Sequence, residues 1–192
     1  MKQLIILLAI IAIPFSGIAQ NNYKKLAYNN ARNIPWEDSK KLVWSDFKAR
    51  PDGRVDADAV TAYSISIEPE MQNDRIVLMI NNNFLKHESW VKEESDHLLT
   101  HEQGHFNIAE IYVRKLRMEI NALEYSQSLQ DEIDVIYERI FNELDQMQQK
   151  YDRETNLSRN KNAQKSWDVW MERQLRSLEA YKFPAVIIDL PE

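Results

Sequence analysis

The sequence has no cysteine among its 192 residues. This absence excludes a disulfide scaffold and thiolate metal ligands, so any metal site must use histidine, aspartate or glutamate. Histidine is also scarce, with four in the chain, and the 24 basic residues are outnumbered by 30 acidic ones, for a formal net charge of −6. A negative chain is repelled by phosphates, so we expect no nucleic-acid partner.

Long hydrophobic runs are missing except near the N-terminus. Lys2 gives a basic start, Leu4–Phe15 is apolar, and Gly17-Ile18-Ala19 is a small-residue cleavage site. This pattern predicts a signal peptide over residues 1–19, with a retained N-terminal anchor as the alternative. The run is too short for a lasting membrane span. We therefore expect residues 20–192 to form one exported, monomeric domain, located in the periplasm or outside the cell.

The chain is organised around His101-Glu102-Gln103-Gly104-His105. On a helix, two histidines four residues apart lie on one face, where they can bind one zinc ion. A glutamate directly after the first histidine can take a proton from a zinc-activated water. The alternative is a charge-paired and inert histidine pair on a partly buried helix face.

Hydrophobic periodicity predicts an α+β fold. Alternation of apolar and polar residues, or a short apolar run, marks two strands and a C-terminal edge strand, and spacing of three and four marks helices. The result is a small antiparallel sheet, then a long helix with the histidine pair in an antiparallel helical hairpin, and a C-terminal helix. The expected strands are 56–68, 75–80 and 186–188, and the expected helices are about 96–126, 129–151 and 161–181.

A catalytic zinc needs three protein ligands and one open position. Reflecting the histidine pair through a hairpin turn near Gln127 brings the segment around residue 151 beside the metal. Asp152 and Glu154 are the candidate oxygen ligands there. Tyr151 is either a hydroxyl donor to a developing oxyanion or a core aromatic residue. Glu110 is not counted as a ligand, because it is expected to form a surface ion pair with Arg114.

Several segments resemble one bacterial family of unknown function, whose members are often described as secreted zinc-dependent proteases related to the zincin-type metallopeptidases. The central match is the decapeptide from His101 to Glu110. The flanking matches are Trp44-Ser45-Asp46-Phe47, Ser89-Trp90-Val91, Arg114-Lys115-Leu116-Arg117, Tyr151-Asp152-Arg153-Glu154-Thr155, Gln164 and Trp167.

The resemblance implies a zincin-like metal helix and peptidase activity. Relatives commonly read Tyr-Asp-x-x-Thr-x-His-Gly, and their histidine is a further ligand candidate. This chain has Leu157 at that place, so we expect Asp152, which matches the family pattern, to be the third ligand.

The predicted function is a zinc metallopeptidase that hydrolyses a peptide or protein substrate. His101, His105 and Asp152 hold Zn²⁺, Glu102 is the general base, and Tyr151 assists. The alternative, suggested by the missing histidine, is an exported, non-catalytic relative that binds zinc or a protein partner.

Overall fold

The computed structural model describes residues 32–191, so the predicted signal peptide lies outside the described residues. The fold is α+β, as the sequence predicts. Its main sheet is antiparallel and is built on one long central strand. This sheet contains β1 (Asn33–Pro35), β3 (Tyr63–Gln72), β4 (Arg75–Leu85) and β6 (Ala185–Asp189), and β2 (Ala59–Val60) pairs separately with β5 (Trp90–Val91).

The central strand β4 is longer than predicted. It pairs with β3 along one side and with β1 and β6 at the two ends of its other side. The three asparagines at 81–83 continue the strand, because β3 pairs with all three and β1 pairs with Asn83 from the other side. This pairing overrides their turn preference. The predicted strand 56–68 divides into β2 and β3, and β6 is the edge strand that the sequence predicts.

The helices are α1 (Asp96–Ile120), α2 (Leu129–Thr155) and α3 (Lys161–Ser177), with 3-10 turns at Trp44–Asp46 and Glu179–Tyr181. Ser95 caps α1 by accepting a hydrogen bond from the backbone of Leu98. Helix α1 ends six residues before its predicted limit and α2 ends four residues after it. No helix in the described part of the chain is long and apolar enough to cross a membrane.

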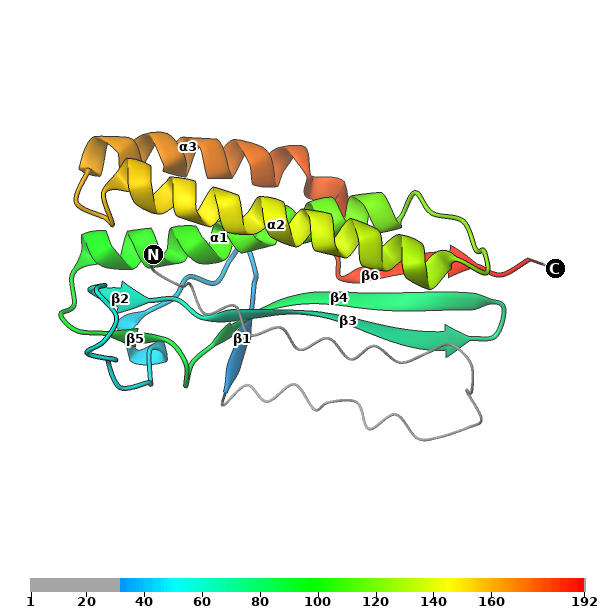
Figure 1. Cartoon of the computed structure of the whole chain (residues 1–192), viewed down its shortest axis with the longest axis horizontal. Coiled ribbons are helices and arrows are strands. Elements are labelled where there is room, and N and C mark those ends of the chain that lie inside the picture. The colour runs from blue at the N-terminus through cyan, green and yellow to red at the C-terminus, as the bar shows by residue number, and fades with distance from the viewer. Residues whose placement is uncertain (1–31, 192) are drawn as a thin grey trace.

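Helix α1 is the middle layer of the fold. It lies against the sheet on one side and against α2 and α3 on the other (Figure 1). Apolar side chains of the sheet and of all three helices meet around it. Because α1 is covered from both sides, its buried surface extends nearly all round and takes in both histidines of the central motif.

One prediction about the surface of α1 is wrong. Glu110 and Arg114 form an ion pair, but both are buried. The carboxylate of Glu110 also accepts a hydrogen bond from Arg117, whose guanidinium reaches the carbonyl oxygens of Ile80 and Tyr181. Burial raises the pKa of Glu110 in spite of the two arginines. The pair is buried because the sheet and α3 cover this face of α1.

Candidate metal centre

Three side chains converge at the middle of the fold. The Nε2 atoms of His101 and His105 lie 3.2 Å apart, and Asp152 Oδ1 lies 3.2 Å from the first and 3.1 Å from the second. Both histidines are buried, whereas Asp152 is partly exposed. Two ligands at about 2.0–2.1 Å from a tetrahedral zinc ion lie about 3.3 Å apart. The spacing of these three atoms therefore fits one such ion.

The long α2 brings Asp152 to this place. Helices α1 and α2 form the predicted antiparallel hairpin, with a register one residue away from the simple reflection. Asp152 lies in the last turn of α2, not in a loop. The other oxygen candidate, Glu154, points elsewhere and accepts a hydrogen bond from the indole of Trp167. Of the two carboxylates, only Asp152 joins the histidines.

The electrostatics of the metal-free cluster follow from burial and charge. Burial alone would lower the pKa of His105, but the adjacent Asp152 carboxylate outweighs burial and raises this pKa to about 9. Burial alone would raise the pKa of Asp152, but the two imidazoles hold it well below its ordinary value. A positive charge is therefore favoured between these side chains, whether a proton or a metal cation supplies it.

Glu102 is buried beside the histidines. Thr61, which follows β2, donates its hydroxyl hydrogen to Glu102 Oε2 at 2.7 Å. Both side chains line a cavity together with His101, His105 and Asp152. Thr61 thus holds the carboxylate of Glu102 by one oxygen at the wall of the cavity that His101, His105 and Asp152 also line.

Tyr151 lies directly beside the metal cluster. Its ring stacks on His101 with centroids 4.6 Å apart, and its hydroxyl donates to the His101 carbonyl at 3.2 Å. Gly104 allows this packing, because a Cβ atom there would lie 2.1 Å from the hydroxyl oxygen. Tyr151 is fully buried and does not line the cavity. This placement favours the core-aromatic alternative over oxyanion donation.

The cavity at the cluster is small, with a volume of about 80 Å³. The turn between α2 and α3 forms part of its wall. Asn156, Leu157 and Ser158 all have positive φ in this turn, and Leu157 lines the cavity. Arg159 pairs with Asp58 at 3.2 Å across the wall. Space for water is present, but an extended peptide would require this wall to move.

His97 and His87 stay outside the cluster. His97 lies in the first turn of α1, and its Nε2 contacts the carbonyl oxygen of Ser158. It therefore connects the start of α1 with the turn that covers the cavity. His87 is exposed in the turn between β4 and β5.

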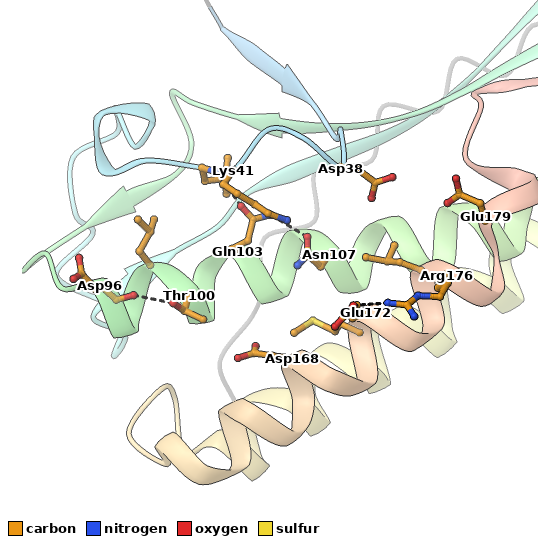
Figure 2. A pocket seen from close by; sticks show the side chains of 14 residues that line it. Asp38, Lys41, Asp96, Thr100, Gln103, Asn107, Asp168, Glu172, Arg176 and Glu179 are labelled. Carbon is orange, nitrogen blue, oxygen red and sulfur yellow. Dashed lines mark hydrogen bonds and ion pairs between the residues drawn. The ribbon is translucent and has the colours of Figure 1, made fainter.

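A larger pocket of about 770 Å³ lies on another side of α1 (Figure 2). Helix α3 contributes Asp168, Glu172 and Arg176 to it, and α1 contributes Gln103 and Asn107, among other residues. The metal cluster does not open into this pocket. Asp168 nevertheless connects the two, because it accepts a hydrogen bond from Gln164, which contacts His101.

Two buried glutamines contact the histidines, a role that the sequence did not predict for either of them. Gln148 Oε1 lies 2.7 Å from His105 Nδ1, and Gln164 Oε1 lies 3.3 Å from His101 Nδ1. A usable signal for Gln148 was its position one turn before Asp152, on the same face of α2. Gln164 belongs to the family resemblance, but its position on α3 carries no local signal for a contact with His101.

The family comparison agrees with the resemblance at a coarse level. Residues 86–161 match the model of a family described as bacterial protein of unknown function (DUF922). The matched region covers less than half of the chain but contains His101, Glu102, His105 and Asp152. The family description names no protease activity. Separate comparisons with curated proteins and with solved structures found no match.

Proposed function

We propose that this protein is an exported zinc-dependent peptidase with a zincin-like site. His101, His105 and Asp152 are the proposed ligands. The observation that carries the proposal is the convergence of three ligand atoms, one from each residue, at mutual distances of 3.1–3.2 Å. Three protein ligands around one cation leave a fourth position for water or substrate, as catalytic zinc sites require.

Bound zinc would lower the pKa of a water molecule and polarise the scissile carbonyl. Glu102 is the proposed general base, which accepts a proton from the attacking water and passes it to the leaving amine. Thr61 holds one carboxylate oxygen of Glu102, so the other oxygen is free for the proton transfer. Burial of Glu102 keeps bulk water from competing for that oxygen.

The first test is metal binding. We expect the purified protein to bind one equivalent of zinc, and Asp152→Asn to lower the zinc affinity at least tenfold. Glu154→Gln is the matched control, because it neutralises a nearby carboxylate of α2 that does not reach the histidines. Equal zinc affinity in Asp152→Asn and wild type would remove Asp152 from the site.

The second test is catalysis. Glu102→Gln keeps the length of the side chain and an oxygen for Thr61, but an amide cannot accept the proton. We expect this variant to bind zinc normally and to cleave an unfolded protein substrate at least 100-fold more slowly. Cleavage at the wild-type rate would exclude Glu102 as the base.

A non-catalytic zinc-binding protein is the second candidate function. The small cavity, with the apolar side chain of Leu157 in its wall, favours this second candidate, because a cavity of this size has no room for a peptide in this conformation. Zinc binding without cleavage of a broad peptide library would support this alternative. Cleavage that requires zinc and Glu102 would reject it.

A further inference from the structure

The amide of Gln148 has a fixed orientation. Its Nε2 donates to the carbonyl oxygen of His105 at 2.9 Å and to the hydroxyl of Tyr63 at 3.1 Å. Because the carbonyl oxygen only accepts, the nitrogen end must face it, and Oε1 then faces His105 Nδ1 at 2.7 Å. An amide oxygen only accepts as well. Nδ1 of His105 therefore carries a hydrogen, and its Nε2 is the atom that faces the metal cluster.

The amide of Gln164 is oriented by a different residue. Its Nε2 donates to Asp168 Oδ1 at 2.8 Å, and a carboxylate oxygen only accepts. The same Nε2 also donates to the hydroxyl oxygen of Tyr151 at 2.7 Å, and Oε1 is thereby left facing His101 Nδ1 at 3.3 Å. The hydrogen of this imidazole is thus also placed on Nδ1. Asp168 itself lies on the side of α3 that lines the larger pocket (Figure 2).

We propose that Gln148, Gln164 and Asp168 are positioning residues for the metal cluster. Gln148 acts on His105, and Gln164, which Asp168 orients, acts on His101. Each imidazole is thereby set to the Nδ1–H tautomer, and both Nε2 lone pairs point toward the metal position beside Asp152. The expected effect on zinc affinity rests on the proposed function, because it requires that zinc binds at this site. The tautomers themselves follow from hydrogen bonds within the chain. Asp168 acts from outside the metal cavity, through Gln164.

Neutral amides suit this task. A carboxylate that accepts from a metal-binding imidazole orients the ring and also adds negative charge, whereas an amide oxygen only orients it. Asp152 then remains the one carboxylate among the converging atoms. Loss of such supporting contacts typically lowers metal affinity 10- to 100-fold.

The decisive variant is Asp168→Asn, which changes one half-buried side chain that touches no proposed ligand. An asparagine amide can donate as well as accept, so Gln164 is no longer prevented from turning its own amide around. We expect zinc affinity to fall about tenfold. Glu172→Gln is the matched control, because it neutralises a carboxylate of the same helix and the same pocket that pairs with Arg176. We expect its zinc affinity to stay within threefold of wild type.

Gln148→Met and Gln164→Met test the two amides directly, and we expect each to lower zinc affinity 10- to 100-fold. Their control is Gln103→Met, which removes a half-buried glutamine of α1 that bonds Leu42 and Asn107 away from the cluster. Long-range ¹H–¹⁵N NMR spectra of the histidine rings supply a readout that loss of stability alone would not change. In spectra recorded well above pH 9, where His105 is neutral, we expect Nδ1–H on both imidazoles of the metal-free wild type and a mixture of tautomers at His105 in Gln148→Met.

The two proposals fail separately. Nε2–H as the neutral tautomer of His105 or His101 in the metal-free wild type would overturn the positioning role, whatever the zinc result. Tight zinc binding that is unchanged in Asp168→Asn and in both methionine variants would also overturn it and leave the proposed function intact. A wild type with Nδ1–H tautomers but no zinc binding would support the positioning of the rings and reject the zinc site.

Discussion

Replacing Gly104 with alanine tests the packing that supports the histidine pair. The added Cβ would lie 2.1 Å from the hydroxyl oxygen of Tyr151 and 2.7 Å from its Cζ atom. Ordinary contact begins near 3.4 Å. The ring must therefore move by roughly 1 Å in an interior that has no spare room.

The magnitude follows from the surroundings of Tyr151. Overpacking a buried site costs about 1–3 kcal/mol, and each lost hydroxyl hydrogen bond costs about 1 kcal/mol. Alanine gains about 1 kcal/mol over glycine in a helix. If one hydroxyl hydrogen bond is lost, these contributions add to a net loss of about 1–3 kcal/mol in the free energy of unfolding. Because the ring stacks on His101, we also expect zinc affinity to fall at least tenfold.

Urea unfolding of the metal-free protein measures the stability change, and competition with a chromophoric chelator measures the zinc affinity. Gly53→Ala is the control, because a Cβ there meets no atom within 4 Å. In a Tyr151→Leu background the clash is gone, and Gly104→Ala should be neutral or stabilising by up to about 1 kcal/mol. An equal loss of stability in both backgrounds would refute the reasoning.

Three further predictions follow from charges in the structure. The metal-free protein should lose roughly 3 kcal/mol of stability as pH rises from 6.5 to 9, because protonated His105 stabilises the fold fully below pH 6.5 and loses its proton near pH 9. Asp152 has the opposite effect in another range: its lowered pKa means that its contribution to stability is lost only as pH falls below 3.8. Thermal melts check this, and a flat profile between pH 6.5 and 9 would contradict it. Arg159→Ala removes the ion pair with Asp58 across the cavity wall, so we expect a chelator to remove zinc about two- to fivefold faster from this variant than from the control. The control is Arg54→Ala, which removes an exposed ion pair with Asp52 instead. Glu110→Gln leaves the buried guanidinium of Arg117 without its ion-pair partner, while Arg114 keeps longer ion pairs with Asp38 and Glu179. This variant should cost about 3–5 kcal/mol by urea unfolding, and a loss below about 1 kcal/mol would contradict the buried pair.

Local patterns predicted most of the secondary structure. The three helices, the edge strand at β6 and the inward placement of His101 and His105 all follow from periodicity, because a helix or strand must bury its apolar face whatever it packs against. Helix and strand ends were less predictable. The asparagine run at 81–83 stays in β4 because all three residues pair with β3 and Asn83 also pairs with β1. Helix α2 continues to Thr155 because its last turn packs beside α1.

The sequence by itself determined that a histidine pair lies on one face of a buried helix, with a glutamate in the next position. The tertiary structure alone decided between Asp152 and Glu154, since neighbouring residues of one helix point in different directions and only the hairpin register brings one of them to the imidazoles. It also decided that Gln164 and Asp168 support His101 from a third helix. Such contacts depend on how separate elements pack, and no spacing along the chain records that packing.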